Sequence, residues 1–275
     1  MALPSFVPSV VGTGGEMTAI VQADHGWDID PRDDRKIYIL WLGLLWVGIA
    51  SGFAADLPHF LSQTPSASLV IHLHALVFVA WLVILTAQIA LVNRDRVDLH
   101  MKLGRLAVIW VGLMLVLGAA ASLTARAQYD ATSRHPGALI AVNIADLGGF
   151  GVLTLVALAF RAQSAIHKRL MLLASVSLAD PGFYRLLLAV RGVTGSLIPQ
   201  ASDATTRFVE IFYGNILIIG GMTIWDLVRR GRLHPAFVAG AVGLLSAEYA
   251  AAYVYGLPAF GQAAMRVVAL WPIRS

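Results

Sequence analysis

The chain of 275 residues contains no cysteine and few charged residues. Without cysteine there is no thiol nucleophile, no disulfide scaffold, no iron–sulfur cluster held by thiolates and no cysteine zinc site. Charged residues make up only 13% of the chain, whereas a typical soluble domain has about 25%. Hydrophobic residues reach 58% and the mean hydropathy is +0.73. These values exclude a disordered chain and an ordinary soluble enzyme, and they predict a membrane protein.

Seven apolar stretches are long enough to cross a bilayer, whose hydrocarbon core of about 30 Å requires about 20 residues of helix. They cover residues 37–55, 68–92, 104–124, 137–160, 168–190, 208–228 and 235–257. The fifth and seventh are the weakest, because Asp180-Pro181 interrupts one and Glu248 lies in the other. The sequence therefore predicts an all-α fold, a polytopic bundle of seven transmembrane helices.

The segments outside these stretches differ from the apolar middle of the chain. Residues 1–35 lack the basic start and continuous apolar run of a secretory signal and are rich in Gly and Asp, so we expect a polar cytoplasmic tail. Residues 36–258 form the expected transmembrane domain. Residues 259–275 include Arg266 and Trp271, which favour a C-terminal tail that lies at the membrane interface.

The basic residues predict the orientation of the bundle. The loops on one side of the seven stretches, together with the N-terminal segment, hold 13 of the 20 Lys and Arg residues. Basic residues accumulate on the cytoplasmic side, so this side and the N-terminus should be cytoplasmic. The formal net charge of +4 fits such loops in a chain this apolar, and we expect no nucleic-acid partner.

Three histidines recur at a spacing of 67 residues, each just after a basic loop: His100, His167 and His234. The first two begin apolar stretches that run in the same direction, so they should lie at the same depth. His100 and His167 are therefore candidate axial ligands of one haem, with Lys102 and Arg169 as candidate partners of its propionates. The alternative is that histidine simply suits the membrane interface.

Polar side chains from five of the stretches fall at a similar depth in the outer half of the expected bundle. They are His74, Asn143, Asp146, Asp180, Asn215 and Glu248. Ionisable groups in hydrocarbon are costly and usually pair with one another or line a site. Three interpretations stay open: a metal ion bound by His74, Asp146, Asp180 and Glu248, a proton or ion pathway through the carboxylates, or structural hydrogen bonds between helices.

Several motifs between residues 65 and 190 resemble a widespread family of bacterial multi-pass membrane proteins without a settled activity. The resembling residues are His74, Trp81, Gln88, Leu99-His100 with Leu103-Gly104, Asp146, and His167-Lys168-Arg169-Leu170-Met171 with Pro181 and Arg185. The resemblance implies a multi-pass protein of the bacterial inner membrane.

The chain is also distantly similar to the two-haem transmembrane cytochromes b, which hold haem between histidines of paired helices. His100 and His167 match the inner pair of that family, whereas at the outer side His74 faces Asn143 where a second histidine is needed. The likeness implies at most one haem b, and our hypothesis adds a quinone as the electron partner. A redox protein is thus the leading hypothesis, beside an accessory subunit of a larger membrane complex and a transporter that uses the intramembrane carboxylates.

Overall fold

The computed structural model describes residues 31–130, 135–194 and 202–272, and in these ranges it is helical without any strand. Most of the expected cytoplasmic tail, residues 1–30, lies outside the described residues. The predicted all-α fold is confirmed. In chain order the helices are α2 (Pro31–Ser62), α3 (Leu69–Asn93), α4 (Val97–Tyr129), α5 (Leu139–Ala159), α6 (Ser164–Val176), α7 (Asp180–Thr194), α8 (Ala204–Arg230), α9 (Pro235–Tyr255) and α10 (Pro258–Ala269).

The lengths and compositions of the helices support seven membrane spans. Helices α2, α3, α4, α5, α8 and α9 are the 6 that can each cross a bilayer alone, and α6 with α7 makes up to 7 as one bent span. The two halves of that span differ in direction by 44°. Large apolar side chains such as Leu76 (66% exposed) and Ile109 (73% exposed) face outward, as lipid-facing residues do.

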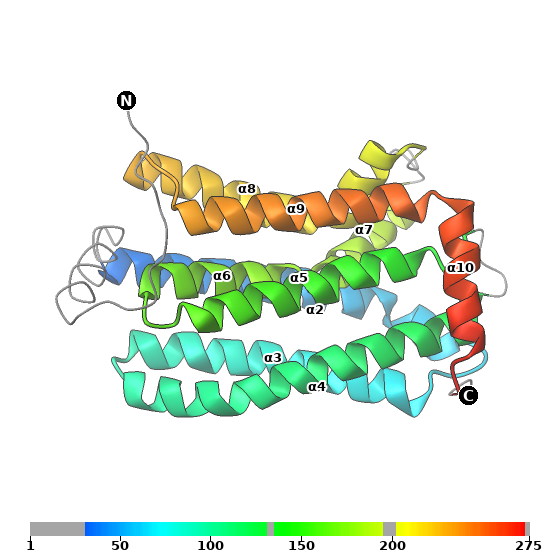
Figure 1. Cartoon of the computed structure of the whole chain (residues 1–275), viewed down its shortest axis with the longest axis horizontal. Helices are drawn as coiled ribbons and strands as arrows, with labels where there is room; N and C mark the ends of the chain where they lie inside the picture. The colour runs from blue at the N-terminus through cyan, green and yellow to red at the C-terminus, as the bar shows by residue number, and fades with distance from the viewer. Residues whose placement is uncertain (1–30, 131–134, 195–201, 273–275) are drawn as a thin grey trace.

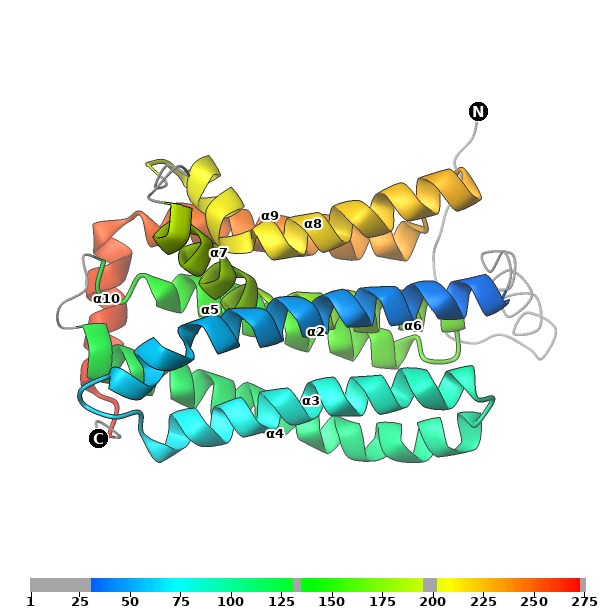
Figure 2. The same ribbon diagram turned by 180° about the vertical axis from the view of Figure 1, so that it is seen from behind.

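The turns that hold the basic residues gather at one end of the bundle. The start of α2 and the α3–α4, α5–α6 and α8–α9 turns lie together at that end, which we call the basic end (Figures 1 and 2). Helix α10 runs across the opposite end, where the indole of Trp271 donates to Thr124 Oγ1 at 2.9 Å. This arrangement agrees with the loop order predicted from charge, and the interfacial position of residues 259–275 stays a prediction.

Local sequence signals set the boundaries of α8 and α9. Asp203 caps α8, and hydrogen bonds from Thr206, above all from its backbone N–H, hold the pKa of the Asp203 carboxyl below its usual value. The helix ends at Gly231, whose φ of 64° is a left-handed conformation that glycine adopts without strain. His234 caps α9, and Pro235 occupies its first turn.

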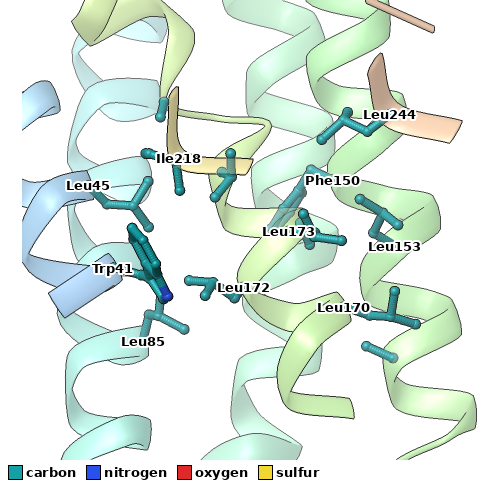
Figure 3. Packing of buried hydrophobic residues seen from close by; sticks show 14 of the residues in the cluster. Trp41, Leu45, Leu85, Phe150, Leu153, Leu170, Leu172, Leu173, Ile218 and Leu244 are labelled. Atoms are coloured by element: carbon teal, nitrogen blue, oxygen red, sulfur yellow. The ribbon is translucent and has the colours of Figure 1, made fainter. Parts of the chain in front are cut away.

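Tryptophan side chains tie the α3–α4 hairpin together and join it to the rest of the bundle. Trp46 of α2 donates to Thr86 Oγ1 at 3.0 Å, and Trp81 of α3 donates to Ser175 Oγ on α6 at 3.3 Å. Within the hairpin, the indole of Trp110 donates to Val77 O at 3.0 Å. Each indole N–H is thereby satisfied inside the protein, which the hydrocarbon environment requires. Around them lies the apolar core, to which Trp41, Leu45, Phe150 and Leu173 contribute (Figure 3).

The break between α6 and α7 is held by close contacts of glycine. Phe183 lies between Gly48 of α2 and Gly214 of α8, and a Cβ at either glycine would collide with its ring. One turn along α2, a Cβ at Gly52 would collide with the carbonyl oxygen of Gly182. Small residues allow helix backbones to approach closely in membranes. The start of α7 is thus fixed between α2 and α8.

The Gly52→Ala variant tests this close approach. The added methyl has no room against the Gly182 backbone, so we expect a loss of about 1–3 kcal/mol in the free energy of unfolding, as overpacked sites show. The measurement is unfolding of the purified protein in mixed micelles. Gly43→Ala on the same helix is the control, because its Cβ meets nothing within 4 Å. Equal stability of the two variants would contradict the assigned α2–α7 packing.

The orientation can be tested by cysteine labelling, for which the cysteine-free chain is a clean background. Ala162→Cys places a thiol at the exposed α5–α6 turn of the basic end, and Ser66→Cys places one at the opposite end, between α2 and α3. In intact cells a membrane-impermeant maleimide should label the Ser66→Cys variant only. Permeabilised cells should label both. The reverse pattern would invert the orientation, and labelling of both in intact cells would exclude a spanning arrangement.

Candidate functional site

The structure brings His100 and His167 together at the basic end. His100 lies in the first turns of α4 and His167 in the first turns of α6, and both are half-buried. Their ring centroids are 6.3 Å apart, and their planes are nearly perpendicular at 86°. The sequence predicted equal depth for these residues, and the structure adds that their rings are neighbours. His234, the third member of the repeat, is instead the buried N-cap of α9, where its Nδ1 accepts from Ala236 N–H.

The hydrogen bond of His167 defines which of its ring nitrogens is free. Nδ1 lies 2.9 Å from the carbonyl oxygen of Ala157, which is two residues before the end of α5. A carbonyl oxygen only accepts, so Nδ1 carries the proton and Nε2 keeps its lone pair. Histidine ligands of metals almost always donate their second ring N–H in this way. His167 is therefore in the tautomer that a metal ligand needs.

His100 is held by the side chain of Gln88, which comes from α3. The Gln88 amide lies 2.6 Å from Nδ1 of His100, and it also contacts the backbone oxygen of His100 at 3.1 Å and Gly104 N at 2.9 Å. The orientation that satisfies all three contacts has the amide nitrogen donating to Nδ1. A metal on Nε2 would require Nδ1–H to donate instead, so the Gln88 amide would have to turn over.

The spacing of the two rings fits axial ligation of one iron. An imidazole nitrogen binds a transition metal at about 2 Å, which puts the centroids of two axial rings about 6 Å apart. The observed centroid distance is 6.3 Å. The pair is thus a donor set that could hold one iron, with the Nδ1–H of His167 already donated to a carbonyl and the Gln88 hydrogen bond of His100 still to be reversed.

The two residues predicted to pair with propionates lie differently. Lys102 is exposed on α4, two residues after His100. Arg169 is 2% exposed and points toward α8, where its Nε lies 3.8 Å from Asp226 Oδ2 and its Nη1 donates to Ala165 O. Arg230 also pairs with Asp226. Arg169 is thus engaged away from the histidine pair, beside a small cavity lined by residues of α2, α8 and α9.

A second group of polar side chains lies at the break between α6 and α7. Asp146 of α5, Asp180 of α7, Asn215 of α8 and Glu248 of α9 are each at most 5% exposed, and we call them the acidic cluster. Asn215 Nδ2 donates to Asp180 Oδ2 and to Glu248 Oε1, both at 2.7 Å. Asp146 is close enough to both acids for their charges to interact. Three of the four predicted metal ligands are therefore neighbours.

Interruptions in two helices place these side chains. Asp180 is the first residue of α7, so the break in the span delivers its carboxyl into the core. At the end of α6, Ser177 Oγ donates to Ala174 O at 2.8 Å and to Asp146 O at 3.2 Å, which joins the break to α5. Helix α8 has a non-helical residue, Phe212 (φ −106°, ψ 17°), one turn before Asn215. The sequence predicted the first interruption from Asp180-Pro181 but gave no sign of the second.

The remaining members of the predicted polar layer lie elsewhere. His74 of α3 stacks on Phe78 with ring centroids 4.1 Å apart, and its buried Nδ1 lacks a hydrogen-bond partner. Asn143 donates to Ser122 Oγ of α4 at 2.5 Å. Within the described ranges, no three His, Asp or Glu side chains are placed to hold a metal ion. The metal site of His74, Asp146, Asp180 and Glu248 is thus not assembled as a ligand set.

Sequence reasoning missed two partners that shape these sites. Arg185, five residues after Asp180, donates from Nε to Asp56 Oδ2 at 2.8 Å rather than to Asp180. Asp226, which binds Arg169, lies within residues 208–228, which the sequence predicts only as an apolar span. In each case the partners are far apart in sequence, and a lone carboxylate near the end of an apolar stretch was the only available signal.

Comparison of the chain with protein-family models, with curated proteins and with solved structures finds no match.

Proposed function

We propose that this multi-pass membrane protein binds one haem b between His100 and His167 and exchanges electrons with a quinone in the bacterial inner membrane. One observation carries the proposal. The two rings come from different helices, lie 6.3 Å apart at the basic end, and His167 presents an unprotonated Nε2. The distant likeness to two-haem cytochromes b, which rests on the same two histidines, supports it further.

The residues around the pair hold its geometry. The last residues of α5 place Ala157 O against Nδ1 of His167, which fixes both the tautomer and the direction of this ring. Gln88 links α3 to the start of α4 and positions His100. Bound haem supplies one-electron redox chemistry through its iron, with a potential set by axial ligands, hydrogen bonds and burial. Quinone is the proposed partner because it is an apolar carrier that reaches such a site through the bilayer.

An optical spectrum of the full-length protein, purified in mild detergent from haem-supplemented cells, tests the proposal. We expect a b-type spectrum that changes on reduction with dithionite and with a short-chain quinol. His100→Ala and His167→Ala should each lose the bound haem because each removes an axial ligand. His59→Ala is the control, since this exposed residue lies near the end of α2 that is opposite the basic end, where its ring contacts the side chain of Gln63. A colourless wild type that co-purifies with partners would instead favour an accessory subunit.

The positioning role of Gln88 gives a second test. With haem bound, the turned-over Gln88 amide oxygen would accept from Nδ1–H of His100. Gln88→Leu removes this acceptor but keeps the size of the side chain, so haem should bind about 10–100-fold more weakly, as is usual for such supporting residues. The midpoint potential should shift as well. The measurements are haem transfer to excess apomyoglobin and a redox titration. Gln262→Leu, on the exposed side of α10, is the matched control. Equal haem retention and potential in both variants would show that Gln88 does not position the ligand.

A further inference from the structure

The acidic cluster gathers three carboxyl groups in the membrane interior without a basic partner. Asp146, Asp180 and Glu248 are 5%, 1% and 0% exposed. Among the described residues, none of the ion pairs involves any of the three. Charged side chains are costly in hydrocarbon unless they are paired. Three carboxylates at this place would therefore carry a large uncompensated charge.

The acidic cluster has fewer hydrogen-bond donors than acceptor oxygens. Asn215 offers one donor atom, Nδ2, which already serves Asp180 and Glu248. Four further oxygens are buried and have no partner: Asp146 Oδ1, Asp180 Oδ1, Glu248 Oε2 and Asn215 Oδ1. Asn215 Oδ1 is the oxygen of a neutral amide in a fully buried side chain. The unpartnered oxygens of the cluster are therefore not all carboxyl oxygens. Ionised carboxylates only accept, whereas a protonated carboxyl donates. A proton on a carboxyl supplies the missing donors.

The neighbouring charged groups are engaged elsewhere. Arg185 of α7 binds Asp56 of α2 and the backbone oxygen of Pro181. Arg191 pairs with Glu210, and Arg207 donates to Ala252 O. Other titratable groups in this half of the bundle include His74 of α3, Tyr184 of α7, Tyr213 of α8 and Tyr255 of α9. At the end of α4, Arg126 and Asp130 pair with each other. Within the described part of the chain, no three His, Asp or Glu side chains are placed to hold a metal ion, whereas a proton needs only one carboxyl oxygen.

We propose that the acidic cluster is an intramembrane proton-binding site, in which protonated carboxyls among Asp146, Asp180 and Glu248 donate to the unpartnered oxygens, including Asn215 Oδ1. The site lies at the 44° break of the α6–α7 span, and Ser177 joins that break to Asp146. Uptake or loss of the proton therefore changes hydrogen bonding where the span is interrupted. The proposal does not depend on haem binding.

Infrared spectroscopy of the full-length protein in detergent, in H2O and in D2O, tests this site. Wild-type protein at neutral pH should show the C=O absorption of a protonated carboxyl, with a shift on deuteration. Asp180→Asn, Glu248→Gln and Asp146→Asn should remove or shift part of this absorption. The amide side chains introduced in these variants carry their own donor hydrogens, so the melting temperature of each variant should equal or exceed that of the wild type. Asp98→Asn is the control, since this exposed carboxyl pairs with Arg96 and should contribute nothing.

Each contrary result has a distinct meaning. Absence of the absorption in wild type at neutral pH would overturn the proposal without need of any variant, so a variant that fails to fold does not leave it open. An absorption that all three amide variants retain would place the proton elsewhere and also overturn it. If NaCl, compared with choline chloride, removes the absorption and raises the melting temperature of wild type but not of Glu248→Gln, the site binds sodium instead.

Discussion

The fold depends on the requirement that every polar group in hydrocarbon finds its partner inside the protein. Unbroken helices meet this requirement for the backbone, and tryptophan donors such as Trp46 and Trp81 meet it between helices. Two interruptions depart from it: the kink at Phe212 in α8, and the break where α6 stops at Val176 and α7 begins at Asp180. The Ser177 hydroxyl and the Asn215 amide form hydrogen bonds with some of the polar groups at this break. Close contacts of glycines around Phe183 hold the break in place.

The two sites lie on the α6–α7 span. Helix α6 presents His167 near its start, at the basic end, and stops beside the acidic cluster after 13 residues, about 20 Å of helix. Its buried face packs against α5, which contributes both Ala157 beside His167 and Asp146 in the cluster. A pair of packed helices thus connects a candidate electron site with a candidate proton site. The ligand of each is proposed independently, so either can be tested without the other.

Hydropathy and charge predicted most of the fold, because crossing a bilayer constrains composition directly. The seven spans, the weak fifth span and the side to which each loop belongs all follow from the lengths of the apolar stretches and the places of the basic residues. The proximity of His100 to His167 did not follow, since sequence spacing gives depth but not which helices are neighbours. His234 shows the limit of reasoning from spacing. It has the same spacing and lies at the same end of the bundle, but its role there is to cap α9.

Depth alone also overestimated how many residues of the polar layer share one site, because depth says nothing about the direction in which a side chain points around the helix axis. His74 and Asn143 are at the expected level but turn to Phe78 and Ser122, whereas Asp146, Asp180, Asn215 and Glu248 converge. Arg169 is a similar case. It lies two residues, about 200° of helical rotation, from His167 and so points toward Asp226 instead of toward the histidine pair. In a bundle whose outer surface is apolar, the rotation of each helix decides which polar residues share a site.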